Sequence, residues 1–107
     1  MRGPFPKGTY TGHILPQKRR NWGHLEPGRR YIVSREFLDF DNDLHAPGVS
    51  WVFLGYSYHH MDEGLSLFVT MDGEQEWYLP LQGGADRQGG VMDQLELYIK
   101  LETADRP

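Results

Sequence analysis

SWVFLGYSY, residues 50–58, is the stretch that decides the fold, and LSLFVTM (65–71) and QEWYLPL (75–81) extend it. In the second and third runs apolar and polar side chains alternate, which is the two-residue period of a β-strand. The first run is apolar on both faces, as is typical of a central or strongly curved strand. Gly55 in its middle predicts a bend or bulge. Because only short polar turns separate the three runs, we expect neighbouring antiparallel strands.

The turn between the last two runs decides which side chains face each other. A two-residue turn at Asp72-Gly73 would place Val69 opposite Glu76, a charged residue. A three-residue loop with Gly73 in the left-handed conformation changes the parity and pairs apolar side chains with each other. We therefore expect the loop Met71-Asp72-Gly73, with Leu67 opposite Trp77 and Leu65 opposite Leu79.

The remaining elements complete a mainly β domain. Residues 30–37 alternate as a half-buried strand, and residues 40–48 have the Asp, Asn, Pro and Gly content of a loop. Residues 82–90 read as a Gly-rich linker, and residues 91–102 have helical spacing. The apolar stripe of that helix comprises Val91, Met92, Leu95, Tyr98 and Ile99. We predict four to five antiparallel strands that form a small bent sheet or an SH3-like barrel, with a C-terminal helix.

The region Leu25–Gln82 resembles an uncharacterised bacterial domain family of unknown function. The motifs that carry the resemblance are Leu25-x-Pro27-Gly28-x-x-Tyr31, Phe37-x-Asp39-Phe40-Asp41, His45-x-x-Gly48, Trp51-x-Phe53-Leu54-Gly55-Tyr56, Gly64-Leu65-Ser66-Leu67-Phe68-Val69 and Asp72-Gly73-x-x-Glu76-Trp77. These are residues of strands and turns and not a catalytic set. The resemblance implies a small β-rich domain and no particular activity.

Charge divides the chain into two parts. Residues 1–35 carry eight basic side chains and one acidic, a net +7, whereas residues 36–107 carry three basic and fourteen acidic, a net −11. We predict a basic, Gly/Pro-rich arm at 1–24, with at most a short strand at Thr9–Leu15, followed by a globular domain at 25–107. Opposite charges predict that the arm lies on an acidic, aromatic surface of its own or a neighbouring chain. Its expected apolar anchors are Tyr10, Ile14 and Trp22, and its expected charge pairs involve Arg19 and Arg20.

Composition limits the compartment. The chain contains no cysteine, so it has neither a disulfide nor a thiolate metal site. No apolar run approaches the roughly 20 residues of a membrane span, and we expect no secretory leader. We therefore expect a cytoplasmic protein that does not act at a membrane.

Two groups of side chains have metal-binding chemistry. Asp39, Asp41 and Asp43 have the first spacings of a calcium loop, but Leu44 and Ser50 stand where that loop needs Gly and Glu, so we read a solvated acidic turn. Imidazole and carboxylate groups suit zinc and similar ions, which gives a second candidate in which one loop histidine joins His45. This metal-dependent enzyme hypothesis comprises His45, His59, His60, Asp62 and Glu63.

A nucleic-acid-binding module is a second alternative. It would use the basic cluster Lys18, Arg19 and Arg20 on phosphates and stack Trp22 on a base. The acidic remainder of the chain would repel nucleic acid, so the hypothesis is favoured less.

A small binding module that acts by protein–protein contact is the function the sequence favours. No nucleophile motif, P-loop or dinucleotide-binding glycine pattern is present, so we assign no catalytic residue and no cofactor and lean against an enzyme. Acidic side chains and surplus aromatic side chains suit an inhibitor, an immunity-type protein or a self-associating dimer. The predicted partner-binding residues are Asp39, Asp41, Asp43, Tyr58, Phe68, Glu74, Glu76 and Tyr78.

Overall fold

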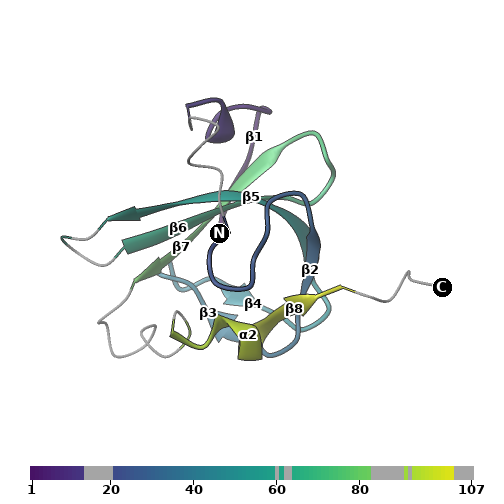
Figure 1. Ribbon diagram of the computed structural model, residues 1–107, viewed down its shortest axis with the longest axis vertical. Coiled ribbons are helices and arrows are strands. Elements are labelled where there is room, and N and C mark those ends of the chain that lie inside the picture. The colour runs from purple at the N-terminus through teal and green to yellow at the C-terminus, as the bar shows by residue number, and fades with distance from the viewer. Residues whose placement is uncertain (14–20, 60, 62–63, 83–90, 92, 103–107) are drawn as a thin grey trace.

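One antiparallel sheet dominates the computed structural model, which describes residues 1–13, 21–59, 61, 64–82, 91 and 93–102. Within these residues the sheet has six strands in the order β1-β7-β6-β5-β2-β8, and β3 and β4 form a separate two-stranded ribbon (Figure 1). The sheet ends at β1 on one side and at β8 on the other, so it is open and not closed into a barrel. The mainly β fold and its bent-sheet form are confirmed, with more strands than the four to five expected.

The centre of the sheet lies where the sequence placed it. β5 (Ser50–His59), β6 (Gly64–Thr70) and β7 (Glu76–Gln82) begin and end within one residue of the three predicted runs. The pairing of β5 with β6 shifts register between Phe53 and Gly55, which confirms the predicted bulge. The extra residue changes the parity of β5, so Tyr56, opposite Leu67, lies on the same face as Phe53.

The predicted register of the β6–β7 hairpin is wrong by two residues. Leu67 faces Leu79 and Val69 faces Trp77, which leaves residues 71–75 as a five-residue loop. Asp72 Oδ1 accepts the backbone N–H groups of Glu74 and Gln75, each at 2.8 Å. Thr70 Oγ1 accepts the N–H of Gly73 at 2.9 Å. These side-chain hydrogen bonds stabilise the longer loop. Because the register differs from the predicted one by two residues, every side chain still lies on its expected face of the sheet.

The predicted strand at 30–37 is divided in two. β2 (Arg30–Val33) pairs with β5 and with β8 (Ile99–Leu101), whereas β3 (Phe37–Leu38) leaves the sheet and pairs with β4 (Leu44–His45). The break falls at Ser34 and Arg35, whose N–H groups both donate to the carbonyl oxygen of Tyr98. The chain therefore turns at residues 34–36 and starts the ribbon.

The C-terminal helix is shorter than predicted. α2 spans Leu95–Tyr98, and the next three residues are strand β8. Val91, Leu95 and Ile99 are buried, so these stripe residues do face the core, and Met92 lies outside the described residues. The helix ends because Ile99 adopts an extended conformation and continues along the edge of β2.

The N-terminal segment, defined here as residues 1–13, adds an edge strand to the sheet. β1 (Arg2–Phe5) runs antiparallel to β7, and Thr11–His13 form a 3-10 helix, η1. A strand at Thr9–Leu15 is therefore wrong for residues 9–13, and Ile14 and Leu15 lie outside the described residues. Gly3, at φ +135°, allows the close approach of β1, because a Cβ there would lie 2.9 Å from the Glu76 carbonyl oxygen.

The hydrophobic core is assembled from Leu25 onward. Its buried members come from β2, the ribbon, the three central strands and the C-terminal region, while Met1 and Trp22 are partly buried beside it. The ribbon and α2 lie on the same side of the molecule, with Phe37 and Tyr98 ring centroids 5.9 Å apart (Figure 1). Among the described residues no helix is long and apolar enough to cross a membrane.

Candidate functional site

The acidic loop, defined as residues 39–43, is built around a buried carboxylate. Asp39 is 0% exposed, and its Oδ1 accepts the N–H groups of Asp41 at 2.8 Å and Asp43 at 3.1 Å. Its Oδ2 lies 2.8 Å from His45 Nε2, and the His45 ring stacks on Phe37 at 4.6 Å. Asp39 therefore shapes the loop and leaves Asp41 and Asp43 at its surface.

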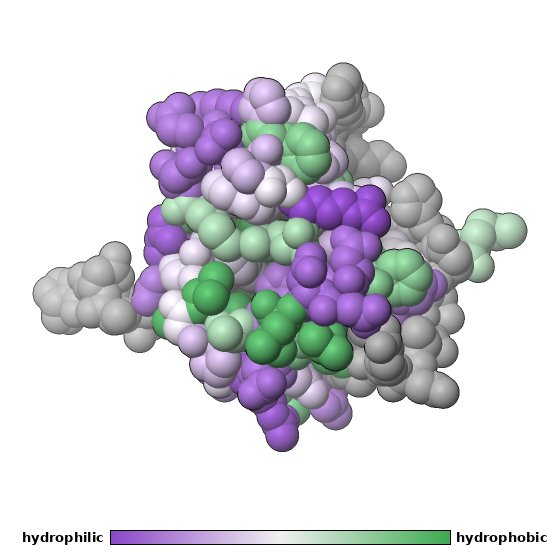
Figure 2. All heavy atoms as spheres, turned by 180° about the vertical axis from the view of Figure 1, so that it is seen from behind, coloured by the Kyte–Doolittle hydropathy of each residue, from purple (hydrophilic) through white to green (hydrophobic). Residues whose placement is uncertain are grey.

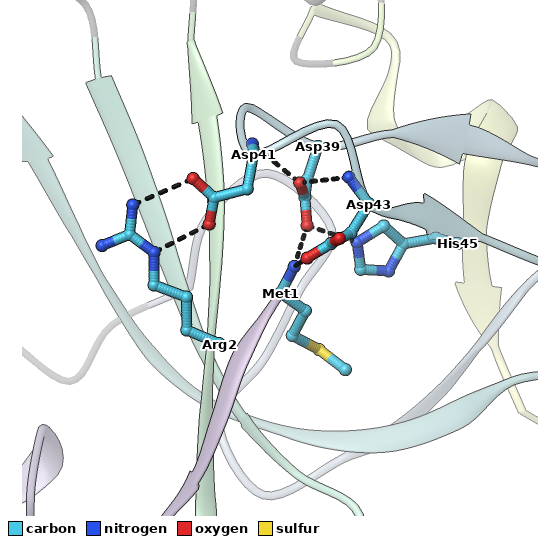
Figure 3. A network of polar contacts seen from close by, with 6 residues as sticks. All are labelled: Met1, Arg2, Asp39, Asp41, Asp43 and His45. Carbon is cyan, nitrogen blue, oxygen red and sulfur yellow. Dashed lines mark hydrogen bonds and ion pairs between the residues drawn. The ribbon is translucent and has the colours of Figure 1, made fainter.

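Two cations from the N-terminal segment meet this loop (Figure 3). The Met1 ammonium group donates to Asp39, and also to Asp43 at 2.6 Å. The Arg2 guanidinium forms a two-pronged pair with Asp41, at 2.7 and 2.9 Å, and lies over the Tyr78 ring at 5.2 Å. The acidic loop thus pairs with two cations of this extended segment.

The pKa values of this cluster follow from burial and pairing. Burial raises the pKa of Asp39, but the hydrogen bonds from the Met1 amine, His45 and Asp43 outweigh it and leave the pKa lowered. Burial lowers the pKa of His45, and the hydrogen bond to Asp39 offsets this only in part. The Arg2 guanidinium lowers the pKa of Asp41. Asp39 and Asp41 are therefore ionised at neutral pH, and His45 there is a neutral hydrogen-bond donor.

A second carboxylate holds the rest of the segment. Glu76 is 3% exposed and lies in β7, beneath residues 8–11. It accepts the N–H groups of Gly8 at 2.8 Å, Tyr10 at 2.9 Å and Thr11 at 3.1 Å, and the Thr11 hydroxyl at 2.5 Å. Burial raises the pKa of Glu76, but these hydrogen bonds outweigh burial and lower the pKa. A charged Glu76 thus supplies the acceptors that this turn of backbone needs.

Aromatic packing completes the contact. The Tyr10 ring stacks on Phe68 at 5.0 Å, and it meets Tyr78 at 5.7 Å and Phe5 at 5.3 Å edge-on. Phe68 and Tyr78 face each other across β6 and β7. Neighbouring residues of a strand point to opposite faces, so this aromatic pair lies on the face away from Leu67 and Leu79.

Trp22 packs against the other face of the sheet. Its ring centroid lies 4.9 Å from Tyr56 and 5.3 Å from Tyr58. Tyr10 and Trp22 therefore contact aromatic side chains of the sheet, as the docking prediction expects. The other residues of that prediction, Ile14, Arg19 and Arg20, and also Lys18 of the nucleic-acid hypothesis, lie outside the described residues.

Of the predicted metal site, the structure describes only the side chain of His45, whose Nε2 lies 2.8 Å from Asp39 Oδ2. The predicted grouping of His45 with a loop histidine stays a prediction. His59 ends β5, opposite Gly64, and His60, Asp62 and Glu63 lie outside the described residues. Carboxylate oxygens of Asp39, Asp41 and Asp43 come within 4.8 Å of one another, a spacing that could hold a cation. In this structure these three carboxylates already have partners: the Met1 amine and Arg2 form ion pairs with them, and His45 donates a hydrogen bond to Asp39.

Seven of the eight predicted partner-binding residues therefore contact residues 1–22 of the same chain. The eighth, Glu74, is exposed in the β6–β7 loop and lines a cavity of about 190 Å³ with Lys7 and Thr11. Sequence reasoning missed Arg2, Gly8 and Thr11, because nothing local marks partners that lie 39, 68 and 65 residues away. The segment-binding surface is defined here as Asp39, Asp41, Asp43, Phe68, Glu76 and Tyr78.

The fold has a solved relative. The structure is similar to that of an integron cassette protein from the mobile metagenome of Vibrio cholerae, with a TM-score of 0.74 and 28% sequence identity. The similarity covers 80% of this chain and 94% of that chain. No protein-family model matches the chain, and no curated protein matches it. These findings agree with the resemblance to an uncharacterised bacterial domain, and they assign no activity.

Proposed function

We propose that this chain is a small non-enzymatic binding module that acts by protein–protein contact through its segment-binding surface. The observation that carries the proposal is the contact with the N-terminal segment, in which acidic and aromatic side chains hold a basic, extended peptide. We take the cytoplasm as its compartment, which a chain without cysteine permits.

The contacts define the chemistry of a partner. The paired carboxylates favour a cation near one end, as Arg2 provides, and the Phe68–Tyr78 pair favours an aromatic side chain, as Tyr10 provides. The edge of β7 favours an extended backbone, the mode of recognition in which a peptide adds a strand to a sheet. The partner would therefore present an extended segment with a basic residue and an aromatic residue about eight positions later.

The N-terminal segment would compete with such a partner. Tethering gives the segment an effective concentration in the millimolar range, so a partner in trans must displace it. Two features support displacement. The buried core is formed from Leu25 onward, and most residues of the segment remain exposed or half-buried. Releasing the segment would thus uncover the surface without opening the core.

A peptide titration tests the proposal. A labelled peptide with the sequence of residues 1–13 is titrated into the wild-type chain and into an Arg2→Ala/Tyr10→Ala chain, whose own segment binds more weakly. We expect the variant chain to bind the peptide at least about tenfold more tightly, because competition is reduced. Adding Glu76→Gln to the variant should abolish binding, while Glu96→Gln, at an exposed position of α2, should not.

Two results would contradict the proposal. One is that the variant chain, shown by circular dichroism to be folded, does not bind the peptide at about 1 mM. The other is equal binding of a peptide in which Arg2 and Tyr10 are both replaced by Ala. If both tests succeed, affinity capture from the host should compare the variant chain with and without Glu76→Gln. A protein retained only when Glu76 is present is then a candidate partner.

A further inference from the structure

The N-terminal segment places a primary ammonium group, and not only a basic side chain, on the acidic loop. The Met1 ammonium donates to Asp39 Oδ2 and, at 2.6 Å, to Asp43 Oδ2. These two carboxylates lie 38 and 42 residues further along the chain, and Figure 3 shows the amine pointing toward both. Asp39 and Asp43 are named the amine site.

The amine site suits a donor that carries charge and more than one hydrogen. A peptide N–H group is neutral and has one hydrogen, whereas an ammonium group is positive and has three, so it can donate to two carboxylates at once. Asp39 is 0% exposed, and the same Oδ2 accepts the hydrogen bond from His45. A buried carboxylate needs a compensating charge, which a neutral imidazole does not supply. Release of the segment would therefore leave a site that a second ammonium group could fill.

The groups beside the amine fix where that ammonium stands in a peptide. The Met1 side chain is 16% exposed and packs against the hydrophobic core. One residue later the Arg2 guanidinium pairs with Asp41, and the backbone from Arg2 onward is the edge strand β1. A lysine carries its ammonium at the end of a four-carbon stem and has no separate apolar side chain. An α-amino group supplies the charge and leaves the first side chain free to pack.

Other parts of the surface are less informative about a ligand. Figure 2 shows hydrophobic side chains gathered on the lower part of the back face, beside strongly hydrophilic ones. Apolar patches mark interaction sites of several kinds. The acidic loop is more specific, because a charged group of known chemistry is bound there at hydrogen-bond distance.

We propose that the acidic end of the segment-binding surface recognises the free N-terminus of a polypeptide partner. The ligand class is a chain whose α-amino group is unmodified, whose first side chain is apolar and whose second side chain is basic. Capture of an N-terminal amine is an established way for a domain to bind an extended peptide. This inference rests on the proposed function and adds which end of the partner is bound.

Three forms of one peptide test the inference. The Arg2→Ala/Tyr10→Ala chain is titrated with a peptide of residues 1–13, labelled at its C-terminus, that has either a free or an acetylated α-amino group. Acetylation removes the charge and leaves a single N–H, so the acetylated peptide should bind at least about tenfold more weakly. A third peptide with Gly-Ser before Met1 keeps the ammonium but moves it by two residues. It should bind as weakly as the acetylated peptide, which separates position from general charge attraction.

A substitution in the amine site locates the effect. Asp43 is 57% exposed, so Asp43→Asn in the same chain should leave the domain folded. It should weaken binding of the free-amine peptide at least about threefold and leave the acetylated peptide unchanged, so the ratio between them falls. Glu96→Gln, which removes one negative charge at an exposed position of α2, is the matched control and should leave the ratio unchanged.

The outcomes separate this inference from the function on which it rests. Equal binding of the free and acetylated peptides would overturn the inference and leave the proposed function standing. A ratio that Asp43→Asn does not lower in a folded chain would also overturn the inference. If none of the peptides binds at about 1 mM, the inference and the proposed function both fail.

Discussion

The two faces of the β6–β7 hairpin are covered in different ways. On one face Leu67 and Leu79 are 0% exposed and pack into the core of the domain. On the other face Phe68 and Tyr78 are covered by the N-terminal segment, which lies more than fifty residues away in the chain. That segment is held by the charged Arg2 side chain, by hydrogen bonds to the Glu76 carboxylate and by the Tyr10 ring. The first cover depends on apolar burial, which is not directional. The second depends on directional contacts that can be removed one at a time.

This difference separates stability from recognition. Removing a core side chain leaves a cavity that weakens the whole domain, because the interior is close-packed. Removing a contact of the N-terminal segment should release that segment and leave the core intact. The covered face is therefore suited to exchange one peptide for another, and the core face is not.

The largest expected effect is on the core face. Leu67→Ala should lower the free energy of unfolding by about 3 kcal/mol, because it removes a fully buried side chain and leaves a cavity. Guanidinium denaturation measures the change. Leu97→Ala is the control: Leu97 is 43% exposed, so the change should stay below about 0.5 kcal/mol. Equal losses in the two variants would show that the core face does not carry the stability.

Glu76→Gln should have the next largest effect, on the covered face. An amide has one oxygen acceptor, so hydrogen bonds to the segment are lost, at a cost of about 2 kcal/mol to its docking. Amide exchange should accelerate at Gly8, Tyr10 and Thr11 and remain slow at Leu67 and Leu79. The comparison fails if the core amides accelerate to the same extent.

Acidification should loosen the covered face before it unfolds the core. The pKa of Glu76 is lowered below its ordinary 4.5, so the released state binds more protons and the stabilisation, complete above that pH, is lost as the pH falls. The lowered pKa of Asp39, to which the Met1 amine contributes, adds a loss below 3.8. The pKa of His45 is lowered mainly by burial, so its protonation lowers the stability of the whole domain as the pH falls below 6.5. Amide exchange of the segment at a series of pH values measures the effect. If Glu76→Gln shows the same loss below pH 4.5 as the wild type, Glu76 is not its source.

Arg2→Ala should have the smallest effect. Its ion pair with Asp41 is half exposed, and ion pairs at the surface contribute little because water and salt screen them. Amide exchange at Gly8 and Tyr10 should increase less than in Glu76→Gln, and added salt should reduce the difference from wild type. A loss of protection larger than that of Glu76→Gln would reverse the order proposed for the two contacts.

Much of the fold could be predicted from periodicity. The two-residue alternation of residues 65–81 placed β6 and β7 within one residue, and Gly55 indicated the bulge in β5. The sequence predicts that the acidic loop and the aromatic pair bind a partner, which stays a prediction; their contacts with Met1, Arg2 and Tyr10 were not predicted in detail. The helix was predicted too long, because the apolar spacing of Leu95 and Ile99 suits a helix and is also satisfied by the turn from α2 into β8.

The sequence by itself determined which faces are apolar, where the central strands lie and that opposite charges occupy the two parts of the chain. These properties are local, since each depends on side chains a few positions apart. Only the tertiary structure decided that β1 lies on β7, that β8 lies on β2 and that His45 pairs with Asp39. The two strand pairings join residues about seventy positions apart, and local periodicity cannot choose among partners at that separation.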